Sequence, residues 1–157
     1  MAPKSDENYV LIVDDDRQVL GLVNQWLTRA GFVVVACDSF EAAKRQLAAQ
    51  TPGVLIADIR LGAFNGLQLA ILAKERDAQT IAFVMSAFDD ASLRSEARLC
   101  GADFLPKPFT REQVVSAVRT AVDARKTTGD VVDSADNADA APVAATPGAV
   151  SSSRLTT

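Results

Sequence analysis

Short apolar runs alternate with longer amphipathic stretches through most of this chain, and this alternation constrains the fold more than any other feature. Five runs are rich in Val, Ile, Leu and other apolar residues and too short for helices; they lie at 10–13, 33–36, 54–57, 81–85 and 104–105. They lack the alternation of apolar and polar residues that marks a half-exposed strand. They are therefore typical of parallel strands covered on both faces.

The stretches between these runs have helical spacing. They span 17–30, 40–50, 66–76, 90–100 and 110–125. In the first, Leu20, Val23 and Leu27 recur at three- and four-residue intervals, and Gly31 stands where a glycine commonly ends a helix. Five strand–helix units in tandem predict a doubly wound, flavodoxin-like (βα)5 domain. We expect a parallel sheet in the order 2-1-3-4-5 with helices on both faces.

Polar residues follow four of the predicted strands. They are Asp14, Asp15 and Asp16 after the first, Asp58 after the third, Ser86 after the fourth and Lys107 with Pro108 after the fifth. Taken singly, each has an ordinary explanation; Asp16, for example, could cap the first helix. The expected strand order, however, gathers them at the carboxyl edge of the sheet, where such folds bind ligands.

Carboxylates gathered in this way repel one another unless a positive charge neutralises them. Mg²⁺ would do so, because it prefers oxygen ligands and needs only one or two carboxylates directly. Lys107 would add a second positive charge. A carboxylate beside Mg²⁺, an ammonium and a hydroxyl is equipped for phosphoryl transfer, which depends mainly on positioning and charge neutralisation.

The composition of the chain argues against several classes of function. The chain has 157 residues, a formal net charge of −4 and no histidine. Without histidine it can form neither a Ser-His-Asp triad nor a phosphohistidine, so any phosphoryl group must come from another protein or a small phosphodonor. The negative charge argues mildly against direct DNA binding. No apolar run approaches the roughly 18 residues that span a bilayer, so we expect a cytoplasmic protein with no membrane contact.

The ends of the chain differ from its middle. Residues 1–8 are polar and predict a flexible start, residues 9–125 form the predicted domain, and residues 126–157 are rich in Ala, Asp, Ser and Thr. We expect the last segment to be a disordered tail, because it has too little apolar material to offset its ordering entropy. The three-residue spacing of Asp130, Asp133, Asp136 and Asp139 leaves a helix as the alternative.

Three further side chains are interpreted as packing residues. Cys37 and Cys100 are far apart in the sequence and are expected to be buried free thiols. Trp26 lies on the apolar side of the first helix and is expected in the core.

With these residues the chain resembles the receiver domain of bacterial two-component response regulators. The matching motifs are Asp14-Asp15 in LIVDDD, Asp58 in LIADIRL, Ser86 in VMSA and Lys107 in LPKPF. The likeness runs from about residue 9 to residue 125. It implies a phosphoacceptor signalling switch, not a classical enzyme, whose partner is a sensor histidine kinase or a histidine phosphotransfer protein.

The resemblance also implies a role for each residue of the site. Asp58 would accept the phosphoryl group. Asp15, Asp58 and the backbone carbonyl of Arg60 would hold Mg²⁺, and Asp14 would act through a bound water. Lys107, Ser86 and Ala87 would bind the phosphoryl oxygens after transfer.

The resemblance further implies a conformational switch. Phe104 would turn inward as the loop at Ser86 moves, and the Lys107–Pro108 peptide bond would be cis. The face formed by residues 89–125 would then contact a downstream protein or a second copy of the chain, and four arginines could make it basic: Arg94, Arg98, Arg111 and Arg119. The first helix, near Arg17, Gln18 and Leu22, would meet the kinase.

Two positions depart from the family pattern. Gly62 stands where the family often has proline, so we expect a looser loop after Asp58. Arg60 is bulky and cationic, and two readings stay open. Its side chain reaches over the acyl phosphate and alters the rate of hydrolysis, or it points into solvent.

Three alternatives remain at this stage. The first is a pseudo-receiver that binds partners without being phosphorylated. The second is a phosphatase of the haloacid-dehalogenase type with Asp14 as nucleophile, although Gln18 and the missing acidic pair after the lysine do not fit that family. The third is that the chain is the receiver half of a longer regulator.

Overall fold

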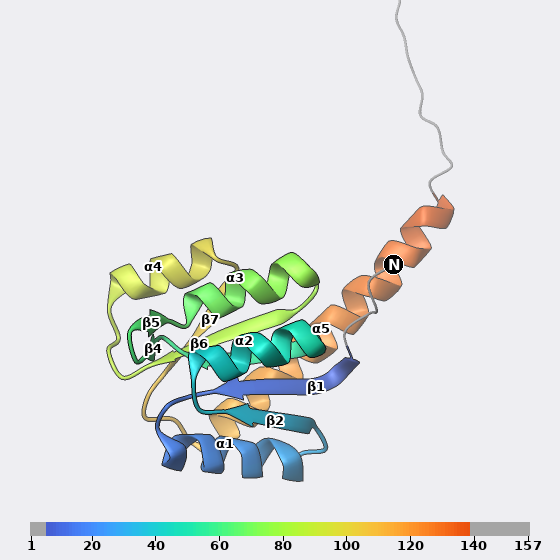
Figure 1. Cartoon of the computed structure of the whole chain (residues 1–157). Helices are drawn as coiled ribbons and strands as arrows, with labels where there is room; N and C mark the ends of the chain where they lie inside the picture. Colours follow the sequence, from blue (N-terminus) through green and yellow to red (C-terminus); the bar gives the residue numbers. More distant parts are fainter. Residues whose placement is uncertain (1–5, 139–157) are drawn as a thin grey trace, which may run out of the picture. The chain divides into compact units, whose positions relative to one another are not determined.

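Residues 6–138 are described by the computed structural model, and through Val122 they are built around one parallel sheet (Figure 1). Its strands are β1 (Asp6–Val13), β2 (Val33–Cys37), β3 (Pro52–Asp58), β6 (Ile81–Ser86) and β7 (Ala102–Pro106). They are ordered β2-β1-β3-β6-β7, and every neighbouring pair is parallel. Because β6 and β7 are the fourth and fifth strands of this sheet, the predicted order 2-1-3-4-5 is confirmed.

Five helices connect the strands. They are α1 (Arg17–Arg29), α2 (Phe40–Ala49), α3 (Leu67–Arg76), α4 (Ala91–Leu99) and α5 (Arg111–Ala138). Side-chain caps fix the starts of α1, α2 and α4: Asp16, Ser39 and Asp90 each accept a hydrogen bond from a backbone N–H of the first turn, at 2.9, 3.1 and 2.7 Å. After α1, Gly31 has the left-handed φ of 100° expected of a glycine that ends a helix.

The sheet separates two apolar cores, and alternate residues of each strand enter opposite ones. On β1, Val10 and Ile12 pack with α1 and the first part of α5, whereas Leu11 and Val13 pack with α2 and α3. Figure 1 shows α1 on one side of the sheet and α2 and α3 on the other. Every residue of β3 is buried, so the strand that ends at Asp58 has little freedom to move.

A short antiparallel hairpin follows Asp58 and was not predicted. It pairs β4 (Arg60–Leu61) with β5 (Phe64–Asn65). Gly62 was expected to loosen this loop, but it lies in the tight turn of the hairpin. Gly62 has a φ of 62°, the left-handed value that the tight turn uses. The ring of Phe64 stacks on that of Phe40 at 4.5 Å, which fastens the hairpin to the start of α2.

The expected boundaries differ at both ends of the described range. Residues 6–8 belong to β1, and α5 continues to Ala138, well beyond the expected start of the tail at 126. In this second part, Thr127 Oγ1 donates to the Asp123 carbonyl at 3.1 Å, as hydroxyls do along a helix. The helical alternative, suggested by the three-residue spacing of the aspartates from Asp130 onward, therefore holds as far as Ala138. Residues 1–5 and 139–157 lie outside the described residues, so the tail stays a prediction there.

The packing residues are placed as follows. Cys37 is buried, and burial is the main cause that raises the pKa of its thiol. Cys100 is only half-buried, since it caps the exposed end of α4, so the expectation of a buried thiol was wrong there. Trp26 is half-buried and lies edge-on to Phe109 at 6.4 Å. Within residues 6–138, the helices do not combine the length and apolar character that a membrane span needs.

The close approach of Gly66 to Asp58 generates a first prediction. A Cβ added to Gly66 would lie 2.0 Å from the carbonyl oxygen of Asp58, so Gly66→Ala must push α3 away from β3. We expect the free energy of unfolding to fall by about 1–3 kcal/mol, measured by urea denaturation. Gly21→Ala is the control, because nothing lies within 4 Å of its Cβ. It should stabilise α1 by about 0.5–1 kcal/mol. Equal stability of the Gly66 variant and the wild type would contradict the close approach.

Candidate functional site

The strand register brings the polar residues of four strand ends together at the carboxyl edge of the sheet. Val13 pairs with Ala57 across β1 and β3, so Asp14 and Asp58, the next residue in each chain segment, are neighbours. Asp58 in turn pairs with Met85 of β6, which places Ser86 one residue farther along. The backbone N–H of Lys107 donates to the Ser86 carbonyl at 2.8 Å, so the lysine after β7 reaches the same edge.

Lys107 holds the two buried carboxylates together. Its Nζ lies 2.8 Å from Asp14 Oδ2 and 3.5 Å from Asp58 Oδ2. Asp14 is 0% exposed and Asp58 is 9% exposed, so both charges are largely removed from water. Burial acts to lower the pKa of Lys107, but its hydrogen bond to Asp14 and the charge of Asp58 outweigh that effect and raise it. The lysine is therefore an ammonium at neutral pH.

Asp58 is the carboxylate whose ionisation the site opposes. Burial, followed by the negative charge of Asp14, raises its pKa from 3.8 to about 6. Lys107 and the backbone N–H of Arg60 act in the opposite direction but do not cancel the shift. The remaining charge imbalance is one that a bound cation would correct.

The donor set suits a hard divalent cation. One carboxylate oxygen from each of Asp14, Asp15 and Asp58 can be chosen so that all three lie within 4.8 Å of one another. Asp15 is exposed, whereas Asp14 Oδ1 already accepts the N–H of Asp16 at 2.9 Å. All three ligands are oxygens, as Mg²⁺ prefers. The residues present therefore fit the predicted metal.

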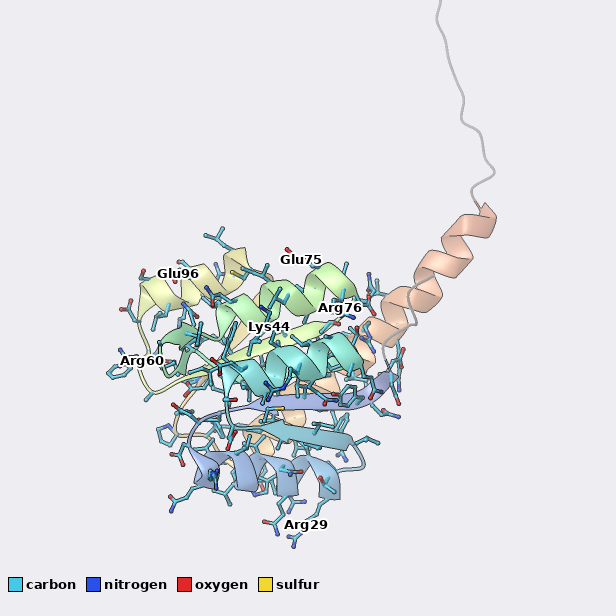
Figure 2. The ribbon with its side chains drawn as sticks, in the orientation of Figure 1. Arg29, Lys44, Arg60, Glu75, Arg76 and Glu96 are labelled. Carbon is cyan, nitrogen blue, oxygen red and sulfur yellow. The ribbon has the colours of Figure 1, made fainter. Side chains whose placement is uncertain are left out.

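The loop after β6 supplies the hydroxyl and an aromatic ring. Ser86 is buried, and its Oγ accepts the N–H of Phe88 at 3.0 Å, which leaves the hydroxyl proton free to be donated. Ala87, the next residue, is exposed. The guanidinium of Arg60 lies 4.3 Å from the centre of the Phe88 ring. Figure 2 shows Arg60 beside the β4–β5 hairpin, at the end of the sheet near the loop that leads to α4.

The aromatic residue predicted to switch lies outside this cluster. Phe104 is half-buried on β7, where it packs against the core on the α2–α3 side of the sheet. The guanidinium of Arg94 lies 4.7 Å from its ring centre. The Lys107–Pro108 peptide bond is cis, the geometry that the resemblance implies.

Sequence reasoning missed Phe88, which is 52% exposed in a loop near the site. It assigned Arg94 only to a basic surface, whereas Arg94 pairs with Asp89 and contacts Phe104. An apolar ring two residues after Ser86 was a usable signal, because an exposed aromatic residue often has a cationic or apolar partner.

The comparison with known protein families identifies the domain. A model of the response regulator receiver domain matches residues 10–119. The chain belongs to the response regulator receiver family. As a receiver domain it is a phosphoacceptor signalling domain of a two-component system, not a classical enzyme, and members of this family interact with histidine kinases and bind Mg²⁺ at an acidic pocket.

Several curated relatives are transcriptional regulators. The chain is 31% identical over 126 residues to the C4-dicarboxylate transport transcriptional regulatory protein DctD of Pseudomonas aeruginosa. It is 36% identical over 115 residues to the DNA-binding transcriptional regulator NtrC of Klebsiella pneumoniae. The alignments cover 80% and 71% of this chain but only 27% and 24% of those relatives. The chain thus matches about a quarter of their length.

Solved structures agree on the fold. A CheY-like response regulator receiver domain protein from Methanospirillum hungatei superposes with a TM-score of 0.72 at 19% identity, covering 76% of this chain and 97% of the other. A receiver domain protein from Clostridium thermocellum gives a TM-score of 0.70 at 20% identity, covering 76% and 98%.

The raised pKa of Asp58 predicts how stability depends on pH without metal. Between the unfolded value of 3.8 and the folded value of about 6, the folded state binds more protons than the unfolded state. The free energy of unfolding therefore falls as the pH rises through this range. Asp58→Asn removes that loss, so we expect it to be more stable than the wild type at pH 7.5 and to lose this advantage toward pH 4. Thermal denaturation of the two proteins in EDTA at both pH values measures this. A stability difference that does not change with pH would contradict the raised pKa of Asp58.

Proposed function

We propose that Asp58 of this receiver domain accepts a phosphoryl group from a phosphohistidine of a partner histidine kinase or phosphotransfer protein. The observation that carries the proposal is the position of Lys107. Its Nζ lies between Asp14 and Asp58, at 2.8 and 3.5 Å, where it can pair with a phosphoryl oxygen once Asp58 is esterified. Because the sequence has no histidine, the phosphohistidine lies outside residues 1–157.

The proposed transfer is a displacement at phosphorus. A carboxylate oxygen of Asp58 forms the new O–P bond while the P–N bond to the partner's histidine breaks, and the imidazole leaves with its electron pair. Lys107 balances charge on the phosphoryl oxygens, and Ser86 donates its free hydroxyl proton to one of them, next to the backbone of Ala87. Asp15 and Asp58, with the Arg60 carbonyl and with Asp14 in support, would hold Mg²⁺, which supplies further charge neutralisation when bound.

Two observations favour Asp58 over Asp14 as the nucleophile. Asp14 is 0% exposed, and both of its oxygens are engaged, one by the Asp16 N–H at 2.9 Å and the other by Lys107 at 2.8 Å. Asp58 is 9% exposed, and its Oδ2 lies 3.5 Å from Lys107 Nζ, farther than the 2.8 Å of Asp14. The haloacid-dehalogenase alternative, which needs Asp14 to attack, is disfavoured for this reason.

A groove beside the site supports the proposed kinase contact on α1. The whole groove encloses about 450 Å³, and its apolar part is formed by Val19, Leu22 and Trp26 of α1 with Pro108 and Phe109 after β7. Of the three α1 residues expected to meet the kinase, only Leu22 lines this groove. Arg17 instead pairs with Asp38 at 3.1 Å.

The proposed output face is the surface of α4, β7 and the first part of α5. It carries Leu99, which is 87% exposed, and its proposed partner is a protein target or a second copy of the chain. Two of the four arginines expected to make this face basic are engaged by other residues. Arg119 donates to the Ala30 carbonyl at the end of α1, and Arg94 is neutralised by Asp89, so Arg98 and Arg111 remain. We propose cytoplasmic action through protein contacts, without DNA binding by this domain.

Phosphorylation at Asp58 is tested with a small phosphodonor. With acetyl phosphate and Mg²⁺, the wild type should gain one phosphoryl group, measured by intact mass, and Asp58→Asn should gain none. Asp16→Asn is the matched control, because Asn also caps helices and the variant should be labelled normally. Label on Asp14 would favour the phosphatase. A wild type that takes up neither acetyl phosphate nor beryllofluoride would be a pseudo-receiver.

Arg60 is proposed to leave the Phe88 ring and cover the acyl phosphate. A guanidinium there pairs with the dianion and hinders water, so Arg60→Ala should shorten the dephosphorylation half-life by up to about fivefold, as expected for about 1 kcal/mol at an exposed site. Phe88→Leu releases the guanidinium from the ring and should lengthen the half-life. An unchanged half-life in Arg60→Ala would mean that the side chain only contacts Phe88 and solvent.

A further inference from the structure

The loop between β6 and α4, residues 87–90, follows Ser86 directly, so a movement of Ser86 must also displace this loop. All four of its residues are exposed. The N–H of Phe88 is bonded to Ser86 Oγ at 3.0 Å, so a displacement of the serine toward a phosphoryl group on Asp58 pulls the loop with it. Whatever fastens this loop therefore opposes that displacement.

Arg94, in the first turn of α4, fastens the far end of the loop. Its Nε and Nη2 donate to the two oxygens of Asp89 at 2.5 and 3.1 Å, a bidentate arrangement. The hydrogen bond from Arg94 is the main cause that lowers the pKa of Asp89. Arg94 and Asp89 therefore form an ion pair at the surface.

The same guanidinium also covers the aromatic residue of β7. Its carbon lies 4.7 Å from the centre of the Phe104 ring, within the range of a cation–π interaction. Phe104 is half-buried, so the guanidinium occupies the part of the ring's surroundings that the core leaves open. One side chain therefore joins the loop, α4 and β7.

We propose that Arg94 is a positioning residue that ties Asp89 to Phe104 and so holds the domain in its resting arrangement. The inference rests on the proposed function, because it concerns the response to phosphorylation of Asp58. A bidentate pair requires Asp89 and Arg94 to keep one geometry, and the ring must stay under the guanidinium. Movement of the loop at Ser86, or of Phe104, breaks one of these contacts. In this proposal both contacts belong to the resting arrangement, so removing them shifts the equilibrium toward the activated state.

The expected consequence of Arg94→Ala is a larger activated population before phosphorylation. One exposed cation–π contact and one exposed ion pair together should change the resting-to-activated ratio by about three- to tenfold. Asp89→Asn should act in the same direction, and the double variant should add little to Arg94→Ala, because both changes break one connection. Arg94→Lys keeps the charge without the planar fork, so its effect should be smaller.

Backbone amide NMR of the whole chain tests this. The resting and the beryllofluoride–Mg²⁺ wild-type spectra define a line for the Ala87 and Phe104 resonances, and unphosphorylated Arg94→Ala should be displaced along that line toward the activated end. Arg98→Ala is the matched control, since Arg98 is an exposed arginine on the same helix, and it should not move. If Arg94→Ala fails to fold, Arg94→Lys and Asp89→Asn give the same reading.

Two results would overturn the inference: resonances of Arg94→Ala that stay at the resting position, or resonances that move away from the activated end. Uptake of phosphoryl from acetyl phosphate is measured on the same samples. Normal uptake by both proteins with unmoved Ala87 and Phe104 refutes the role of Arg94 alone. A wild type that takes up no phosphoryl group refutes the proposed function, and the inference falls with it.

Discussion

Two carboxylates and one ammonium are buried together at the carboxyl edge of the sheet, and the arrangement of the domain depends on that triad. Asp14 and Asp58 repel each other in a poorly solvated place, which is costly unless a cation lies close by. Lys107 provides it from the segment after β7, and its backbone N–H is bonded to Ser86 at 2.8 Å. Charge compensation therefore requires β1, β3, β6 and β7 to lie in register.

The rigid and the adaptable parts of the site are separated. Asp58 ends a strand whose residues are all buried, and Gly66 packs directly against its carbonyl, so the nucleophile has a fixed base. The loop at 87–90 is exposed, and it is held by side chains, not by sheet pairing. Two arginines contact it from different elements, Arg60 through Phe88 and Arg94 through Asp89. When the charge of Asp58 changes, β3 is therefore expected to stay in place, whereas the side-chain contacts of the loop can rearrange.

The sequence was sufficient for what depends on local pattern and topology. The runs of Val, Ile and Leu marked all five strands of the sheet, and their order placed Asp14, Asp58 and Lys107 together, because parallel strands share one carboxyl edge. Features that depend on pairing across space were not accessible. The β4–β5 hairpin is made of two-residue strands, too short for any periodicity. Arg94 and Arg119 appeared equivalent as surface cations, yet one contacts Asp89 and the other the end of α1. The extent of α5 was underestimated because residues 126–138 are poor in strong helix formers, and the spacing of their aspartates was the signal for a helix.

Trp26 gives this domain an optical property of its own. It is the single tryptophan of the chain, and its indole touches the ring of Phe109, two residues from the lysine that binds the two aspartates. Its emission therefore originates from one place, beside the segment that carries the ammonium. Titrations with metal ions, phosphate mimics or the partner kinase can be followed on the native protein without a fluorescent label.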